Sequence, residues 1–292
     1  MSAGNTPVNL KEAIRNLNSL PAMPEIVTKL LALNINSIEG EREMLKLIEQ
    51  DPQITAKIIG LANTPLFCAS KRVSSVSDSA ILLGFTHVKA VTMSIAFMSS
   101  LIMKPAGKLD TEGLWLHSLA TALALGTLSR AMPRNASPPD DEIFLAGLLH
   151  DIGYLVLNHL DQTRSDELHT RCSLEKDRPS AEIEAELLEM DHCELGAELA
   201  HFWNLPDAIV TVLRYHHDPE NEHASAGQPL VSMVNIVEKV LASSIGSHGH
   251  GTVDISHKEW QALGIEQSKA DKLIDQITKQ AKVAKQTAGS FL

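Results

Sequence analysis

The spacing of apolar residues along the chain is typical of α-helices nearly everywhere. Apolar side chains recur at positions i, i+3, i+4 and i+7, which places them on one face of a helix. Alternating stretches rich in Val, Ile, Thr and Tyr, which half-buried strands would need, are hard to find, and aromatic residues make up only 4% of the chain. The pattern therefore predicts an all-α fold.

Capping residues predict where several helices begin. Asp51 followed by Pro52 favours a helix start, because the carboxylate can accept amide hydrogens and a proline at the first helical position has none to satisfy. Asp110 can cap a helix over 114–132, and a buried helix is predicted over 142–160.

Two capping boxes of the form Ser/Asp-x-x-Glu are visible in the second half of the chain. Asp191 and Glu194 form one, which places His192 in the first turn of a helix, where exposed amides favour an anionic group. Ser256 and Glu259 form the other, which opens the terminal helices.

Two breaks in the pattern suggest how the chain is organised. The sequence Lys-Pro-Ala-Gly at 104–107 predicts a boundary between an N-terminal helical subdomain, 1–106, and a helical bundle with C-terminal helices, 107–292. The stretch 244–251, with two histidines in Ser-His-Gly-His-Gly, is predicted to be a flexible link.

The charge of the chain narrows the classes of partner. The 292 residues are enough for one to two compact units, and 36 acidic against 25 basic residues give a net charge of −11. Such a charge attracts neither a phosphate backbone nor an anionic bilayer, so we expect no nucleic acid and no membrane partner. The terminal stretch 269–285 mixes both signs of charge and is interpreted as a solvated helix face.

The cysteines and the apolar stretches indicate a cytoplasmic protein. Cys68, Cys172 and Cys193 are widely spaced, which argues against a disulfide framework and against a cysteine-based zinc site. No apolar segment follows a basic start, so no signal peptide is predicted. The uncharged stretch 113–129 is interpreted as a buried core helix rather than a membrane span.

Several ionisable residues stand inside otherwise apolar helices and need a partner, since burying an unpaired polar group costs about 2 to 7 kcal/mol. Imidazole nitrogens and carboxylate oxygens are ligands for divalent first-row metals. A hydrogen-bonded polar cluster without metal is the alternative interpretation. The candidates are His117, the adjacent His150 and Asp151, His192, and the adjacent His216 and His217.

The sequence Ala-Gly-Leu-Leu-His-Asp-Ile-Gly at 146–153, preceded by His117, resembles the HD superfamily of metal-dependent phosphohydrolases. Further motifs, in the expected order over residues 15 to 245, resemble the HDOD family of bacterial signalling domains. These motifs are Leu-Pro-Ala-Met-Pro at 20–24, Asp-Pro at 51–52 with Leu-Ala-Asn at 61–63, Val-Ser-Ser at 73–75, Trp-Asn-Leu-Pro at 203–206 and Tyr-His-His at 215–217.

The resemblance implies an HD-type helical bundle and a metal-ligand set on matching positions. Glu238 stands where an aspartate would be expected. Tyr154 stands where HD-GYP cyclic-di-GMP phosphodiesterases commonly have a basic residue, and Asp-Pro-Glu at 218–220 replaces their Gly-Tyr-Pro. The implied ligands, for Mn, Fe or Mg, are His117, His150, Asp151, His192, His216 or His217, and Glu238.

These departures favour a signal-transduction module that binds a signalling protein partner or a nucleotide-type ligand without catalysis. A metal-dependent phosphohydrolase, either a phosphodiesterase or a nucleotidase, is the alternative, favoured by the surviving histidines. A purely structural scaffold is the third interpretation of the function.

Overall fold

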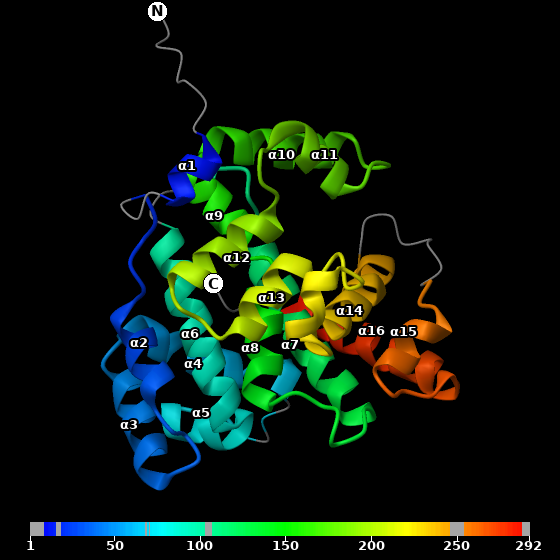
Figure 1. Cartoon of the computed structure of the whole chain (residues 1–292). Helices are drawn as coiled ribbons and strands as arrows, with labels where there is room; N and C mark the ends of the chain where they lie inside the picture. Colours follow the sequence, from blue (N-terminus) through cyan, green and yellow to red (C-terminus); the bar gives the residue numbers. More distant parts are fainter. Residues whose placement is uncertain are drawn as a thin grey trace, which may run out of the picture.

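The computed structural model describes residues 9–15, 19–67, 69, 71–102, 107–245 and 254–287. Within these residues, α-helices and three short 3-10 helices account for all regular structure, and no strand is present, which confirms the all-α prediction (Figure 1). The helices are Leu10–Arg15 (α1), Glu25–Ala32 (α2), Ile38–Glu49 (α3), Pro52–Ala62 (α4), Val76–Leu83 (α5), Phe85–Leu101 (α6), Thr111–Ala131 (α7), Asp140–Leu149 (α8), Gly153–Leu160 (α9), Gln162–Leu174 (α10), Ser180–Leu187 (α11), His192–Phe202 (α12), Asp207–Tyr215 (α13), Leu230–Ile245 (α14), His257–Ala262 (α15) and Ala270–Thr287 (α16), with 3-10 helices at Pro65–Phe67 (η1), Glu222–Gly227 (η2) and Gln267–Lys269 (η3).

The predicted caps do form. The Asp51 carboxylate accepts hydrogen bonds from the amides of Gln53 and Ile54 at 2.9 and 3.0 Å, so that α4 begins at Pro52. The capping box at Ser256 is complete in both directions. At α12, the Asp191 carboxylate accepts from the Glu194 amide at 2.8 Å.

The helix predicted over 142–160 is two helices. The helix α8 ends at Leu149 and α9 begins at Gly153, so the HD pair lies in the turn between them. The prediction of one helix was wrong because apolar residues continue on both sides of the turn, and the break is visible only where His150 and Asp151 turn toward neighbouring helices.

Two parts of the chain are apolar enough to be compared with membrane-spanning helices. The stretch Asp140–Leu160 has the length and hydropathy of a span, but 83% of its most apolar window is buried inside the fold. The helices α5 and α6 meet the same criterion only as a pair bent by 116°. Burial of most apolar side chains inside the fold is typical of core helices, and the described residues of the stretch Asp140–Leu160 show it.

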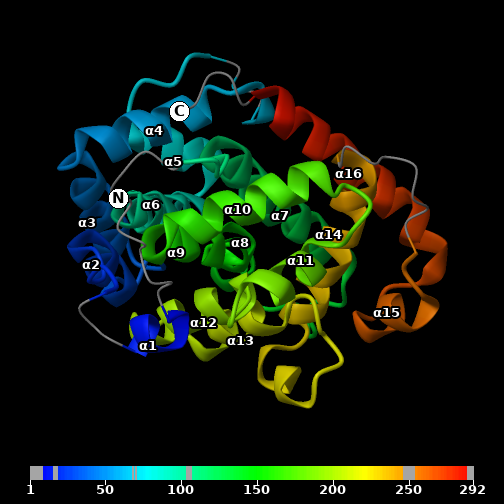
Figure 2. The same cartoon turned by 90° about the horizontal axis from the view of Figure 1, so that it is seen from above.

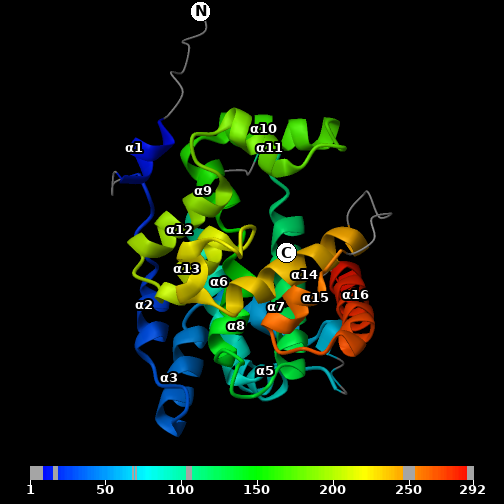
Figure 3. The ribbon, with the colours of Figure 1, turned by 45° about the vertical axis from the view of Figure 1, so that its right-hand side comes forward.

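The bundle is built around α7 and α8, which pack on each other and are surrounded by α6, α13, α14 and α16, while α12 packs on α9 and α13 (Figures 1 and 3). The predicted core helix over 113–129 is α7, which is largely buried. The helices α10 and α11, which no sequence pattern had indicated, pack together at one end of the molecule, with α10 also against α9 (Figure 1).

The N-terminal helices pack directly on this bundle. Trp203, at the end of α12, stacks on Phe97 of α6 with ring centroids 4.5 Å apart, and its indole N–H donates to the carbonyl of Pro21 at 3.0 Å. Residues 104–106 of the proposed boundary and the 246–251 part of the proposed link, with His248 and His250, lie outside the described residues. The division at residue 106 stays a prediction.

The last helix runs along one edge of the molecule, as Figure 2 shows from above. It packs on α7 and α14 and reaches back to η1 among the N-terminal elements. Part of the segment interpreted as a solvated face is therefore a packed helix, with Leu273 and Ile277 buried.

Candidate metal centre

All seven predicted ligand residues come together in one cluster, although they belong to five separate parts of the chain. The structure thus brings together every residue that the sequence singled out; their role as ligands stays a prediction. They are His117 on α7, His150 and Asp151 in the turn after α8, His192 at the start of α12, His216 and His217 after α13, and Glu238 on α14.

Two glycines of the Ala-Gly-Leu-Leu-His-Asp-Ile-Gly sequence let the backbones approach closely enough for this. A Cβ at Gly147 would lie 2.4 Å from Cα of Ala122, so only glycine allows α8 to pack this closely on α7. A Cβ at Gly153 would lie 1.8 Å from the carbonyl oxygen of His192. The first contact brings His150 to His117, and the second brings Asp151 to His192.

The Asp151 carboxylate lies between two groups of histidines. Its Oδ2 is 3.5 Å from Nε2 of His117 and 3.2 Å from Nε2 of His150. Its Oδ1 is 3.5 Å from Nε2 of His192 and 3.7 Å from Nε2 of His216. One carboxylate therefore faces two potential ion positions, one with each oxygen.

Glu238 completes the first group. Its Oε1 is 3.0 Å from Nε2 of His117 and 3.5 Å from Nε2 of His150, and the hydroxyl of Thr121 donates to the same oxygen at 3.3 Å. The longer glutamate side chain thus reaches the place where the resemblance implied an aspartate.

The second group includes Cys193, which was not among the predicted ligands. Sγ of Cys193 is 3.4 Å from Nε2 of His192 and 3.9 Å from Nε2 of His216. One atom from each of His192, Cys193, His216 and His217 lies within 4.8 Å of the others. The prediction against a cysteine-based zinc site rested on the absence of paired cysteines, and here a single thiol lies among histidines from separate parts of the chain.

Hydrogen bonds to the far side of the rings aim the Nε2 atoms inward. Nδ1 of His150 is 2.9 Å from the carbonyl of Gly147, and Nδ1 of His216 is 3.1 Å from that of Val212. A carbonyl can only accept, so each Nδ1 carries the hydrogen and each Nε2 is left for a ligand bond.

Glu184 of α11 contacts the candidate centre directly, and no sequence pattern had singled it out. It is fully buried and accepts from Nδ1 of His192 at 2.8 Å, from the His192 amide at 2.9 Å and from the hydroxyl of Tyr154 at 2.8 Å. The ring of Tyr154 stacks on His192 with centroids 4.3 Å apart. The anionic group expected at the start of α12 is thus the protein's own Glu184, and the only sequence signal for it was an acidic residue on an apolar face.

The carboxylates and histidines of the centre shift one another's pKa values. Burial alone would raise the pKa of Asp151, but the neighbouring His150, His216 and His192 hold it well below its usual range. Burial opposes the charge of His150, yet Asp151 and Glu238 raise its pKa well above the ordinary value. In the same way, Cys193 and Asp151 raise the pKa of His216 to about 9. Without metal, these shifts favour protonated histidines next to the charged carboxylates.

The arrangement suits divalent metals. Imidazole nitrogens, carboxylate oxygens and a thiol converge, and the rings are held by outer hydrogen bonds, as in metal sites generally. His150 is completely buried, whereas the His117 side chain is 32% exposed. His217 is exposed as well, so the centre opens to the outside at His117 and at His217.

The chain matches the family model of the HDOD domain over residues 20–219. It is also similar to an uncharacterized protein of Treponema pallidum (strain Nichols), with 25% identity over 217 residues, which is 73% of this chain and 40% of that protein. The chain thus spans less than half the length of this curated relative.

Solved structures share the fold. An HDOD domain protein of unknown function from Geobacter sulfurreducens has 27% identity and a TM-score of 0.73, covering 94% of this chain and 98% of that one. A candidate signal transduction protein from Marinobacter aquaeolei VT8 has 22% identity and a TM-score of 0.81, covering 99% and 63%. A candidate metal-dependent phosphohydrolase from Shewanella amazonensis SB2B has 15% identity and a TM-score of 0.59, covering 94% and 99%.

Proposed function

The chain belongs to the HDOD domain family, and on that premise we propose that it is a signalling module whose histidine-rich centre holds divalent metal and binds a phosphate group or a partner's carboxylate without hydrolysis. The observation that carries the proposal is the position of Asp151, whose two oxygens face two groups of histidines.

The donor set favours Mn and Fe over Mg. Mg prefers an all-oxygen shell and keeps several waters, whereas imidazole and thiolate suit first-row transition metals. His117, His150, Asp151 and Glu238 would hold one ion, and His192, His216, His217, Asp151 and Cys193 the other. A bound ion would supply Lewis-acid attraction for an oxygen anion.

Two observations support binding without cleavage. Tyr154 stands where the HD-GYP phosphodiesterases commonly have a basic residue. Its hydroxyl donates to Glu184, the carboxylate that accepts from the ring of His192. Among the described residues, the ion pairs of Asp151 and Glu238 are all with histidines, so no lysine or arginine pairs with these carboxylates. A cation placed to stabilise charge on a reacting phosphate is a usual requirement for its cleavage.

A metal-dependent phosphohydrolase is the second candidate, favoured by the same shared carboxylate. Two ions on either side of Asp151 could activate water and stabilise a leaving oxygen. The two candidates differ only in turnover.

Metal-stripped protein supplied with Mn or Fe separates them. We expect either metal to raise the melting temperature, because an ion at a hundredfold excess over its Kd stabilises the folded state by about 2.7 kcal/mol. Asp151→Ala, which removes the carboxylate facing both ion positions, should abolish this shift, and His223→Ala, at an exposed histidine that pairs with Glu222, should keep it. Bis-p-nitrophenyl phosphate and cyclic dinucleotides should remain uncleaved in both metals.

An unchanged melting temperature in wild-type protein that purifies without metal would contradict metal binding and leave a polar cluster. A metal-dependent hydrolysis that Asp151→Ala abolishes would establish the phosphohydrolase instead.

A further inference from the structure

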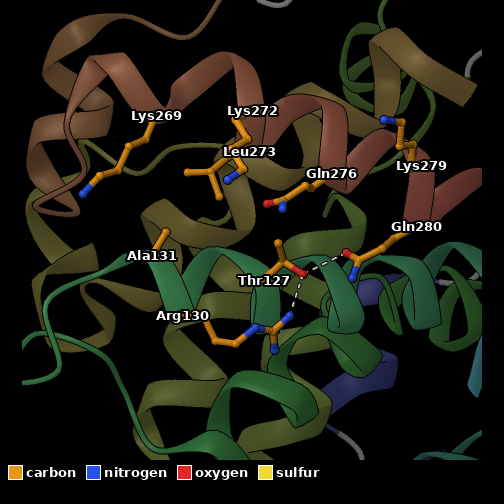
Figure 4. A pocket seen from close by; sticks show the side chains of 9 residues that line it. All are labelled: Thr127, Arg130, Ala131, Lys269, Lys272, Leu273, Gln276, Lys279 and Gln280. Carbon is orange, nitrogen blue, oxygen red and sulfur yellow. Dashed lines mark hydrogen bonds between the residues drawn. The ribbon is translucent and has the colours of Figure 1, made fainter.

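A second candidate site lies away from the metal centre, in a pocket of about 570 Å³ between the C-terminal half of α7 and the last helix, α16 (Figure 4). This volume lies within the range of small-molecule sites, roughly 300 to 1,000 Å³. The matched HDOD region ends at residue 219, so α16 belongs to the part of the chain beyond it. The pocket is lined by Thr127, Arg130, Ala131, Lys269, Lys272, Leu273, Gln276, Lys279 and Gln280.

The lining concentrates positive charge on an acidic protein. Four of its nine side chains are cationic, although the whole chain carries a net charge of −11. Arg130, Lys269 and Lys272 make no ion pair with any described residue, and only Lys279 is paired, with Asp275 at 2.6 Å. Three uncompensated cations around one concavity attract an anion.

Hydrogen bonds hold part of this lining in place. Nη2 of Arg130 donates to the hydroxyl of Thr127 at 2.9 Å, and that hydroxyl donates to Oε1 of Gln280 at 2.8 Å, as the dashed lines in Figure 4 show. The bond to Thr127 uses one of the five N–H donors of the guanidinium. The guanidinium is therefore positioned between α7 and α16 with donors to spare.

The lysines stand at an electrostatically unfavourable end of α16. Lys269 precedes its first residue and Lys272 lies in its first turn, the end at which the helix dipole is positive. Asp271 offsets this only in part. A bound anion would offset the positive charge of both lysines and of the helix end, so anion binding would relieve the repulsion between them.

We propose that the pocket binds a small molecule that carries two or more linked phosphate groups. The three cations without an ion pair line both walls of the pocket, Arg130 from α7 and Lys269 and Lys272 from around the start of α16, so linked phosphates could be contacted from both sides. Leu273 and Ala131 offer apolar surface, and the amides of Gln276 and Gln280 can recognise a polar group attached to the phosphates. The shared chemistry is the phosphate chain, carried by a nucleoside or free.

Titration calorimetry on metal-stripped protein, with ATP and inorganic triphosphate as probes, tests this site apart from the metal centre. We expect both to bind, and Lys272→Gln and Arg130→Gln each to weaken binding about ten- to hundredfold, as the loss of a charge-assisted hydrogen bond predicts. Lys258→Gln is the matched control, because Lys258 is an exposed lysine that pairs with Glu220 outside the pocket. Arg130→Lys, which keeps the charge, should lose less than Arg130→Gln.

Tighter binding of ATP than of triphosphate would identify a nucleoside polyphosphate as the ligand, and equal affinities would identify the phosphate chain alone; both support the site. The proposal is overturned if neither probe binds at millimolar concentration. It is also overturned if Lys258→Gln weakens binding as much as Lys272→Gln does, since the attraction would then be diffuse.

Discussion

Glu184 orients one predicted ligand, His192, without itself being one of the predicted ligands. The carboxylate accepts from both the ring and the backbone amide of His192, while Tyr154 holds it from the other side. His192 keeps the pKa of Glu184 below its ordinary value against the effect of burial. Nε2 of His192 is thereby fixed toward Asp151, which makes Glu184 a positioning residue.

Glu184→Gln should weaken metal binding about 10- to 100-fold, the usual effect of losing a partner that orients a ligand. Glu186→Gln is the matched control, since Glu186 lies two residues further along the chain and pairs with Arg171 and Arg178 at the surface. Competition titration with a chromogenic chelator measures the affinities. Equal affinities for Glu184→Gln and Glu186→Gln would show that Glu184 has no positioning role.

The pKa shifts predict how the metal-free protein responds to rising pH. His150, His192 and His216 all have raised pKa values, about 9 for His216, so the folded state holds more protons than the unfolded chain above pH 6.5. That stabilisation is complete below the unfolded pKa and is lost as pH rises through the folded pKa. The pKa of His117 is raised as well, and the lowered pKa of Cys193, which acts in the opposite sense, is one group against four.

We therefore expect the melting temperature of metal-stripped protein to fall as pH rises from about 6.5 through the pKa of His216, about 9. Metal affinity should rise over the same range, because bound protons must leave before the histidines can bind an ion. Differential scanning calorimetry measures the first effect and chelator competition the second. A melting temperature that rises with pH in this window would exclude protonated histidines in the metal-free centre.

At the scale of elements, the centre depends on how closely the turn at α9 approaches α12. The carbonyl of His192 occupies the space where any side chain at position 153 would begin. This explains the glycine after His-Asp-Ile without reference to catalysis, because a larger residue would separate the elements that carry Asp151 and His192.

Gly153→Ala should destabilise the protein by about 1 to 3 kcal/mol, the usual effect of overpacking, and should lower metal affinity as well. Gly126→Ala on α7 is the control, because its Cβ would meet Nη1 of Arg130 at an ordinary 3.6 Å. A glycine-to-alanine change inside a helix stabilises by up to about 1 kcal/mol where there is room. Urea denaturation and metal titration of both variants measure the difference, and similar values for the two would contradict the close-approach argument.

At the scale of the whole molecule, two distant motifs meet where the N-terminal helices join the bundle. Trp203, from the Trp-Asn-Leu-Pro sequence, stacks on Phe97 and donates to Pro21 of the Leu-Pro-Ala-Met-Pro sequence. The described chain has a hydrophobic core that continues across this junction. The family match from residue 20 onward is consistent with a unit that needs both parts.

Trp203→Ala should cost about 3 to 5 kcal/mol of folding stability, because it removes a buried indole and leaves a cavity. Trp203→Phe retains an aromatic ring on Phe97 and loses the bond to Pro21, so it should cost much less in comparison. Denaturant unfolding measures both. If Trp203→Ala were as mild as Trp203→Phe, the junction would contribute little to stability.

The sequence by itself determined the helical fold and the seven residues of the candidate centre. Helical periodicity and caps such as Asp51 depend on neighbours a few residues away, so they are readable without coordinates. The centre was readable because its histidines are costly to bury and so stand out in apolar helices, and because the order of the motifs resembles one family.

Only the tertiary structure decided which further groups join these residues. Glu184 lies eight residues from His192 in a helix that was not predicted. Cys193 joins the candidate centre only because the fold brings it next to His216, 23 residues away. The pocket of Arg130 depends on a contact between Thr127 and Gln280, which are 153 residues apart. Such contacts depend on how helices pack, and packing is set by the shapes of many side chains at once, which no local pattern encodes.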